Sequence, residues 1–273
     1  MPAAQTHDLS FTDTEVRKRY AHWERGEPDR EWACLTLLDT HARGVAPAPL
    51  RRETDPDGTP VVVMTRLPGD ALGDAPLTTT QTDALGRALR RAYDVPVAAA
   101  REAGVTERIY GPGTLPGTVT EWLGDSYDLA QCRDPDLVRR AVDTALTWLA
   151  EPEALPEPRL SALGISDRKP ANLLWDGHTC RLVDFEDSGL SDSAYELADN
   201  LEHIAGRLAG FLDPEELVDA VGLSPGERER VRAYRPLWAS FWLAMLLPGN
   251  GGFQRNPPGT TEAQAGHVLA LLG

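Results

Sequence analysis

The hydrophobic pattern of this chain changes character about one quarter of the way along it. Up to residue 67, short apolar runs of strand length alternate with polar residues, and one longer segment has helical spacing. Residues 61–64, Val-Val-Val-Met, are typical of a buried strand, and Asp57-Gly58 just before them is typical of a hairpin turn. The expected elements of this part are strands at 16–19, 48–51 and 60–66 and a helix at 28–40.

Beyond the break at Leu67-Pro68-Gly69, helical periodicity dominates the pattern. Helices are expected at residues 79–93, 118–129, 135–149, 192–212, 214–221, 225–247 and 261–271. This order of elements predicts an α+β fold with two lobes. The first is a small N-terminal sheet lobe, residues 1–67, and the second is a larger helical lobe, residues 68–273.

One hairpin is expected inside the helical part. Residues 172–175 and 180–185 are short apolar runs joined by Asp176-Gly177, a dipeptide that favours a two-residue turn between paired strands. Pairing of these strands would bring Asn172 and Asp184 to the same end of the hairpin.

The longest apolar stretch predicts a buried helix. It runs from Leu237 to Leu247, is interrupted by Ser240, and is too short to cross a bilayer. Trp238 and Trp242 recur within it at helical spacing, which is typical of a helix packed in a core.

The charge balance narrows the set of expected partners. A formal net charge of −15 disfavours binding to nucleic acid or to an anionic membrane surface, because both would be repelled. The three cysteines are widely spaced and show no metal-ligand pairing, and the N-terminal residues lack the apolar core of an export signal. We therefore expect reduced thiols and a cytoplasmic protein with neither nucleic acid nor membrane as a partner.

Candidate chemistry begins with the lysines, of which the chain has only two, Lys18 and Lys169. Lys169 lies within residues 166–172, Ser-Asp-Arg-Lys-Pro-Ala-Asn, and Asp184 ends an apolar run twelve positions after the asparagine. Phosphoryl transfer requires an oriented acceptor hydroxyl, bound magnesium and positive charge near the moving phosphate. The segment contains residue types suited to each of these tasks.

The roles follow from the chemistry of the side chains. Asp167 can accept or align the hydroxyl proton, and Lys169 offers a mobile positive charge. Asn172 and Asp184 supply the hard oxygen ligands that magnesium prefers. Capping of a turn by Asp167 is the structural alternative.

These residues resemble those of the aminoglycoside phosphotransferase and choline kinase group, which are relatives of the protein kinases. Residues 167–172 look like the Asp-x-x-x-x-Asn catalytic loop of the group, and Asp184 looks like its metal-binding acid. Residues 187–198 are similar to the segment that leads into the next helix, and residues 61–69 resemble the strand and hinge that contact the nucleotide base. The resemblance spans roughly residues 16–247 and implies a protein-kinase-like two-lobe fold.

The resemblance also implies a nucleotide site that uses Mg²⁺ and ATP or GTP. Lys18 matches the strand lysine that touches the nucleotide phosphates, and Glu31 matches the helix glutamate that pairs with it. Met64, Thr65 and Arg66 match the positions next to the base.

The assignment of Lys18 has an alternative. Arg17 and Arg19 flank this lysine, so the three side chains would also suit a solvated basic patch.

Two features depart from the family pattern. Gly164-Ile165-Ser166 contains none of the histidines that usually precede the catalytic aspartate, so the loop must be anchored in another way. The glycine-rich hairpin that should precede Lys18 is also missing, because the first glycine is Gly26. Either the lid over the phosphates is absent and the nucleotide is held more weakly, or the recorded start lies downstream of the true one.

The acceptor region is expected after the catalytic loop. Asp199, Glu202 and His203 follow it on a predicted helix and could form a wall that suits an amine-bearing substrate. A solvated acidic helix face is the alternative.

The resulting hypothesis is a kinase that phosphorylates a hydroxyl of a small molecule, with an aminoglycoside-type antibiotic ahead of choline-like or ethanolamine-like amines. A catalytically silent nucleotide-binding or regulatory protein is the alternative from another class. A protein kinase is disfavoured because no activation segment follows Asp184.

Overall fold

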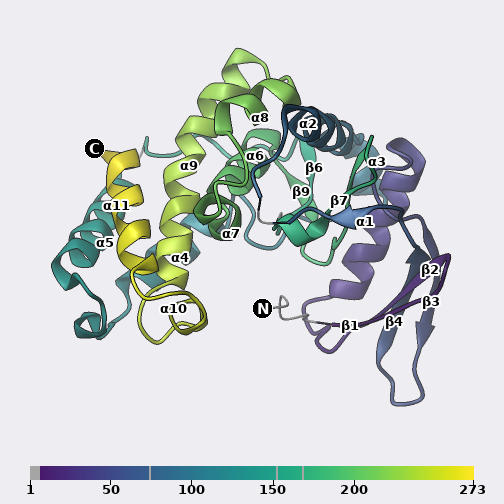
Figure 1. Ribbon diagram of the computed structural model, residues 1–273, viewed down its shortest axis with the longest axis horizontal. Coiled ribbons are helices and arrows are strands. Elements are labelled where there is room, and N and C mark those ends of the chain that lie inside the picture. The colour runs from purple at the N-terminus through teal and green to yellow at the C-terminus, as the bar shows by residue number, and fades with distance from the viewer. Residues whose placement is uncertain (1–6, 74, 152, 168) are drawn as a thin grey trace.

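The structure, a computed structural model, describes residues 7–73, 75–151, 153–167 and 169–273. Its N-terminal part consists of β1 (Asp8–Phe11), β2 (Glu15–Arg19), α1 (Glu27–His41), β3 (Pro49–Thr54) and β4 (Pro60–Thr65). The strands form one antiparallel sheet in the order β1-β2-β4-β3, and α1 packs against β3 and β4 (Figure 1). The three strands and the helix expected here are confirmed, and β1 is an additional edge strand.

The alternation of side chains explains how this sheet is built. Val61, Val62 and Val63 in β4 are all almost completely buried, as the continuous apolar run predicts for a strand covered on both faces. Lys18 pairs with Val62 across the sheet and is buried. Arg17 points to the opposite face of the sheet, where it binds Glu53.

The expected hairpin in the helical part is present. Strands β7 (Leu173–Trp175) and β8 (Cys180–Leu182) pair antiparallel, and β5 (Asp70–Ala71) adds to β7 to complete a three-stranded sheet. Gly69, at the entry to β5, has a φ of 101°, and a Cβ there would lie 2.5 Å from the carbonyl oxygen of Trp175. Glycine is therefore required where the connection between the two lobes crosses this hairpin. A further pair of strands, β6 (Ala162–Gly164) and β9 (Gly189–Ser191), leads into and out of the same region.

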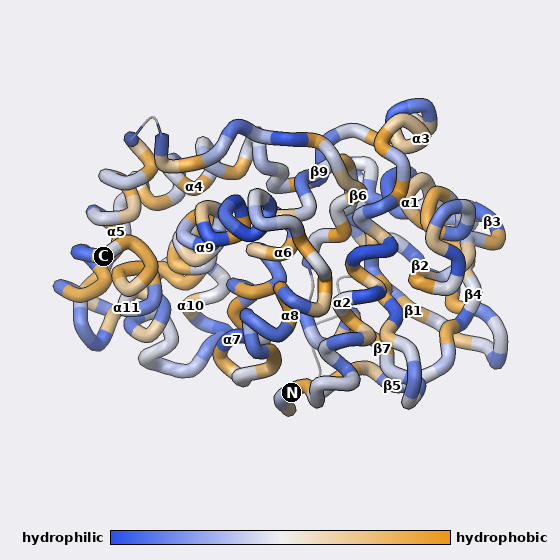
Figure 2. Tube along the Cα trace, turned by 90° about the horizontal axis from the view of Figure 1, so that it is seen from above, coloured by the Kyte–Doolittle hydropathy of each residue, from blue (hydrophilic) through white to orange (hydrophobic). Residues whose placement is uncertain are grey.

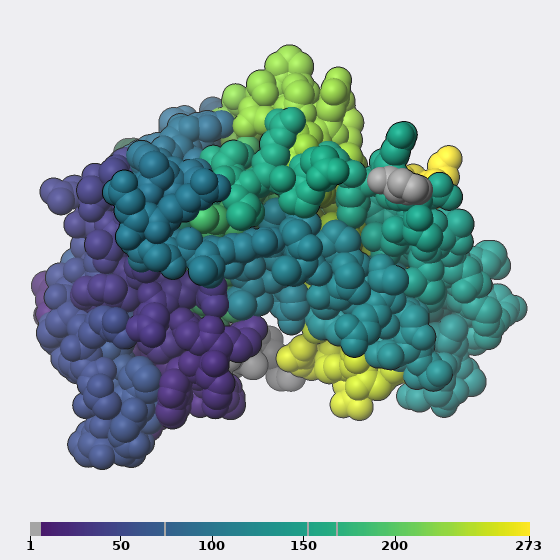
Figure 3. All heavy atoms as spheres, turned by 180° about the vertical axis from the view of Figure 1, so that it is seen from behind, coloured from purple at the N-terminus to yellow at the C-terminus, as the bar shows by residue number. Residues whose placement is uncertain are grey.

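Helices make up most of the remaining chain. They are α2 (Thr79–Tyr93), α3 (Val97–Glu102), α4 (Leu115–Gly124), α5 (Pro135–Leu149), α6 (Ser193–Glu202), α7 (Ile204–Leu208), α8 (Pro214–Val221), α9 (Pro225–Met245), α10 (Gly251–Arg255) and α11 (Thr260–Leu272), with short 3₁₀ turns at Leu129–Gln131 and Pro170–Asn172. Helix α9 packs against both α6 and α11, α2 packs against α8, and α11 packs against α5. The sheet lobe and the α5–α11 pair lie at opposite ends of the molecule (Figures 2 and 3).

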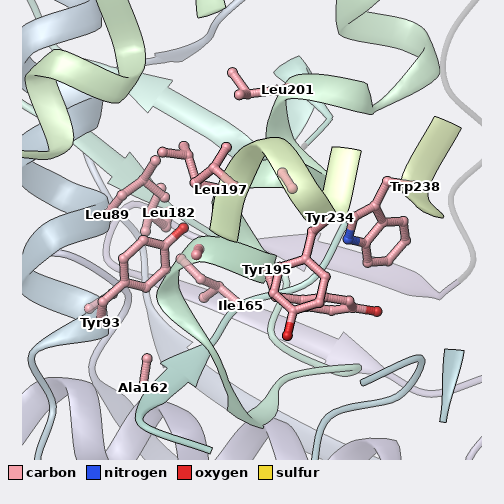
Figure 4. Close-up of a cluster of buried hydrophobic side chains, with 14 of the residues drawn as sticks. Leu89, Tyr93, Ala162, Ile165, Leu182, Tyr195, Leu197, Leu201, Tyr234 and Trp238 are labelled. Atoms are coloured by element: carbon pink, nitrogen blue, oxygen red, sulfur yellow. The ribbon is translucent and has the colours of Figure 1, made fainter. Parts of the chain in front are cut away.

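The centre of the helical part is an aromatic core. Tyr195 of α6 packs edge-on against Tyr234 of α9 and also contacts Trp238, with ring centroids 5.1 Å apart in both pairs (Figure 4). Trp238 is 2% exposed, in agreement with the helical spacing of the aromatic residues in this segment. Within the ranges that the structure describes, no helix combines the length and the apolar character that crossing a bilayer requires.

Two expected helices are corrected by the structure. The helix expected at residues 192–212 is interrupted at His203, whose ψ of 118° is extended, so that α6 and α7 are separate helices. The helix expected at residues 118–129 begins earlier, at Leu115, because Pro116 is well suited to the first turn, and it ends at Gly124. Asp125 then adopts an extended conformation.

We predict that Gly86→Ala destabilises the fold. A Cβ at Gly86 of α2 would lie 2.5 Å from atoms of Ala220 in α8, so the two helices would have to separate. The expected loss is about 1–3 kcal/mol of the free energy of unfolding, measured by urea denaturation. Gly266→Ala in α11 is the matched control, because nothing lies within 4 Å of its added Cβ. It should be neutral or stabilise by up to about 1 kcal/mol, and equal effects of the two substitutions would contradict this account.

Candidate active site

The segment between β6 and β7 is a sharply turned loop. Ser166 and Asp167 have φ values of 42° and 41°, and Asp184, after β8, has a φ of 71°. Non-glycine residues in this region each cost about 1–3 kcal/mol and persist only where surrounding contacts hold them. These three positions therefore identify a constrained loop and hairpin end.

The structure brings Asp167, Asn172, Asp184 and Lys169 together. The side-chain amide of Asn172 donates to the backbone oxygen of Asp167 at 2.8 Å and approaches Asp184 Oδ2 at 3.3 Å. Lys169 Nζ lies 2.7 Å from Asp167 Oδ2 and 3.9 Å from Asp184 Oδ2. The predicted loop residues and the predicted hairpin residues thus face one common point.

Lys18 joins this cluster from the sheet lobe. Its side chain is 6% exposed, and Nζ lies 2.8 Å from Glu31, 2.6 Å from Asp184 and 2.7 Å from Glu186. Burial by itself lowers the pKa of Lys18, but the three carboxylates outweigh it and raise the pKa above its usual value. The lysine is therefore charged and internal, and the alternative of a solvated basic patch is wrong.

Three carboxylates could hold a metal ion here. Oxygen atoms of Glu31, Asp184 and Glu186 lie within 4.8 Å of one another. Burial raises the pKa of Asp184, but the charge of Lys18 outweighs it and holds the pKa below its usual value, so this carboxyl is ionised and able to bind a cation. The donor set of oxygens fits magnesium. Sequence reasoning did not assign Glu186, although its position two residues after Asp184 on the same hairpin end was a usable signal.

A cleft of about 460 Å³ opens beside this cluster. Its polar end contains Lys18, Lys169, Asn172 and Asp184. Its other end is lined by the three expected base-contacting residues and by apolar side chains of β1, β2 and β7, namely Met64, Thr65, Arg66, Leu9, Phe11, Val16 and Leu174. A volume of this size and this division between apolar and charged walls suit a nucleotide.

An imidazole reaches Asp167 from a different part of the chain. His203 Nε2 lies 3.2 Å from Asp167 Oδ1, and the ring packs edge-on against Trp242. Burial by itself raises the pKa of Asp167, but the hydrogen bond to His203 and the charge of Lys169 hold it below its usual range. An imidazole from the α6–α7 break thus contacts Asp167, although no histidine directly precedes Asp167 in the sequence.

A buried arginine anchors the loop that contains Asp167. Arg108, whose side chain is 1% exposed, donates to Glu196 at 2.6 Å, to Asp199 at 3.0 Å and to Ser166 Oγ at 2.8 Å. The other oxygen of Glu196 accepts the backbone N–H of Ile165 at 2.8 Å. Nothing in the local sequence of the loop indicates this anchor, because Arg108 lies 58 positions before Ser166.

The structure does not place Asp199 and Glu202 on an exposed acidic wall. Asp199 is 4% exposed and pairs with Arg108. Glu202 is fully buried and its two oxygens lie 2.6 Å from Arg235 and 2.6 Å from His267. Buried carboxylates require such partners, so both the acceptor wall and the solvated helix face were wrong expectations.

Several solved structures share the architecture of this chain. The chain is similar to the GDP complex of wild-type aminoglycoside 2′-phosphotransferase-IIIa, with a TM-score of 0.67, 16% identity, and coverage of 100% of this chain and 89% of that one. It is also similar to a choline/ethanolamine kinase family protein from Mesorhizobium loti, with a TM-score of 0.63, 19% identity, and coverage of 99% and 86%. Spectinomycin phosphotransferase in complex with ADP and spectinomycin gives a TM-score of 0.59 at 14% identity, with coverage of 98% and 86%.

These similarities establish a protein-kinase-like fold, as the sequence resemblance implied. A search of curated protein sequences finds no match. The model of the phosphotransferase enzyme family matches residues 11–234, which is most of the chain. The protein belongs to this phosphotransferase family, and the expected family resemblance is confirmed.

We predict that the buried cluster around Arg108 titrates. Burial raises the pKa of Asp199 to about 6, because one guanidinium serves two carboxylates. Between the unfolded pKa of about 4 and this value the folded state binds the extra proton, so the Asp199 contribution to the free energy of unfolding falls as pH rises.

Asp199→Asn removes this titration. Between pH 4.5 and pH 7 the wild type should therefore lose about 2 kcal/mol of its free energy of unfolding relative to the variant. Urea denaturation of both proteins at each pH measures this difference. Asp83→Asn on the exposed face of α2 is the control and should show a constant difference. A constant difference for Asp199→Asn as well would contradict the titration.

Proposed function

We propose that the protein is a magnesium-dependent kinase that transfers the γ-phosphate of ATP or GTP to a hydroxyl of a small molecule. The observation that carries this proposal is the convergence of Asp167, Asn172, Asp184 and Lys18 at one end of a nucleotide-sized cleft. Two of these residues come from a loop, one from a hairpin and one from the sheet lobe. Such convergence is what in-line phosphoryl transfer requires.

Each residue has a proposed role. Asp167 orients the acceptor hydroxyl and accepts its proton, and its lowered pKa favours orientation as the larger part of that role. Lys169 and Lys18 neutralise charge on the phosphates. Asn172 and Asp184 would hold Mg²⁺, which supplies the electrostatic stabilisation of the phosphate oxygens.

The charge of the cleft gives the reason for a divalent ion. Glu31, Asp184 and Glu186 surround Lys18, so this end of the cleft has more negative than positive charge. A nucleotide triphosphate would be repelled unless a cation entered with it. Nucleotide affinity should therefore depend on magnesium.

In this proposal one lobe binds the nucleotide and the other binds the acceptor and contains the catalytic residues. Residues 1–67 form the nucleotide-binding lobe, with Glu31 holding Lys18 and with Met64, Thr65 and Arg66 beside the base. Residues 68–273 form the catalytic and substrate lobe, and the protein acts in the cytoplasm.

The acceptor is a small amine-bearing antibiotic of aminoglycoside type, since similar structures include complexes with kanamycin and with spectinomycin. Choline-like amino alcohols are the second candidate, because a choline/ethanolamine kinase family protein is also among the similar structures.

The decisive experiment is a screen of aminoglycosides, other amine-rich antibiotics and small amino alcohols for magnesium-dependent consumption of ATP and GTP. Phosphorylated product identified by mass spectrometry would establish the acceptor. A calorimetric titration with nucleotide addresses the silent alternative, since a protein without nucleotide affinity in the presence of magnesium is not a kinase.

We predict that Asp167→Asn and Asp184→Asn each lower turnover by at least about a hundredfold, since one removes the base and the other a metal ligand. Turnover is measured with the acceptor found in the screen, and circular dichroism verifies the fold. Asp176→Asn in the β7–β8 turn is the matched control, because Asp176 bonds to Thr179 and Arg181 and does not line the cleft. Unchanged turnover in the two site variants would refute the proposed chemistry.

We predict a smaller loss for His203. His203→Ala should lower kcat by about 10- to 100-fold through loss of the hydrogen bond to Asp167, with the KM for nucleotide unchanged. His203→Gln retains an N–H donor and should recover part of kcat. If both variants raised the KM for nucleotide without changing kcat, His203 would not position Asp167.

A further inference from the structure

Strand β1 and the residue before it cover the nucleotide cleft with a row of side chains that changes from apolar to polar. Residues alternate across a strand, so Leu9 and Phe11 point to the same face, and His7 directly precedes the strand. All three line the cleft together with Val16 and Lys18 of β2. Phe11 pairs with Val16 and Leu9 pairs with Lys18 in the antiparallel register. The row therefore runs from apolar at one end of the cleft to polar at the other over about 13 Å.

The two ends of this row coincide with the two ends of the cleft. Phe11 lies beside Arg66, whose guanidinium is 5.8 Å from the ring centroid and also donates to the backbone oxygen of Thr12 at 2.9 Å. His7 lies at the opposite end, where its Nε2 is 2.7 Å from Glu186 Oε2. The same oxygen of Glu186 is also 2.7 Å from Lys18 Nζ. His7 Nε2 and Lys18 Nζ therefore lie no farther apart than twice this distance, which is short enough for both to contact one phosphate group.

His7 is held so that one ring nitrogen faces the cleft. The backbone N–H of Ala21 donates to His7 Nδ1 at 3.1 Å, and the ring packs against Tyr20 with centroids 4.8 Å apart. Since Nδ1 is the acceptor, Nε2 has the proton of the neutral imidazole and is the donor. The side chain is 4% exposed, so this orientation is fixed by packing.

The donor of His7 lacks a well-aligned acceptor. Although Nε2 of His7 and Oε2 of Glu186 are close, both are buried polar atoms without a hydrogen-bond partner among the residues that the structure describes. Buried donors without acceptors are rare and costly, and at a ligand site they point to a ligand group. The carboxylate of Glu186 is close but not aligned with this N–H, whereas a phosphate oxygen in line with it would satisfy the donor.

We infer that His7 is a phosphate-binding residue of the nucleotide cleft and acts beside Lys18. This inference rests on the proposed nucleotide-dependent function. The residues between His7 and Lys18 include no glycine, and the imidazole N–H of His7, directly before β1, provides a contact to the phosphates. Lys18 and His7 would then bind neighbouring phosphate oxygens, and Glu31, Asp184 and Glu186 would hold the magnesium ion that accompanies the nucleotide.

The test is a calorimetric titration of the full chain with ATP and GTP in magnesium, paired with titrations of adenosine and guanosine. His7→Ala should weaken binding of the triphosphate by about tenfold, since one hydrogen bond to a charged group is lost, and should leave binding of the nucleoside unchanged. His7→Gln keeps an N–H donor and should recover part of the loss. His22→Ala is the matched control, because His22 is exposed and is not part of the cleft lining.

The outcomes separate this inference from the proposed function. If the wild type binds the triphosphate and His7→Ala binds it equally well, the inference is wrong and the proposed function remains. If His7→Ala weakens triphosphate and nucleoside to the same extent, His7 only supports the fold and the inference is again wrong. Absence of triphosphate binding by the wild type overturns the proposed function and the inference with it.

Discussion

The buried ion cluster of Arg108 is the interaction on which the catalytic geometry depends. The guanidinium connects Glu196 and Asp199 of α6 to Ser166 of the loop, and Glu196 in turn accepts the loop backbone at Ile165. Burying these charges is costly unless every partner is in place, so the cluster either forms completely or not at all. The positive φ angles of the loop are tolerable because this cluster holds Ser166, the residue just before Asp167.

A second constraint is electrostatic and belongs to the cleft. Lys18 is surrounded by three carboxylates, which secure its charge and also make this end of the cleft negative. The lysine and the metal would thus share the same ligands, and the arrangement fits nucleotide binding only in the company of a divalent ion. On the opposite side of the loop, His203 and Lys169 hold Asp167 ionised. Both lobes contribute charged side chains to one centre, so the candidate site lies where they meet.

The sheet lobe covers one side of the cleft with side chains of β1 and β2. Arg66 ties the turn after β1 to the strand beside the base, through its backbone N–H to Thr14 and its side chain to Thr12. The apolar side chains of β1 then cover the part of the cleft proposed for the base, and His7 reaches the charged end. His7 thus places a polar group beside Lys18, at a position that the sequence analysis did not assign.

The sequence by itself determined what local patterns encode. It predicted the α+β fold, the sheet lobe, the β7–β8 hairpin, and the spacing that brings Asn172 and Asp184 to one end of that hairpin. Only the tertiary structure decided which charges are buried together. Asp199 and Glu202 looked like a solvent-facing wall, yet Arg108 and Arg235 bury them, and His203 reaches Asp167 because α6 ends there. Such pairs join residues far apart in the chain, and their stability comes from desolvation and packing, which no local periodicity records.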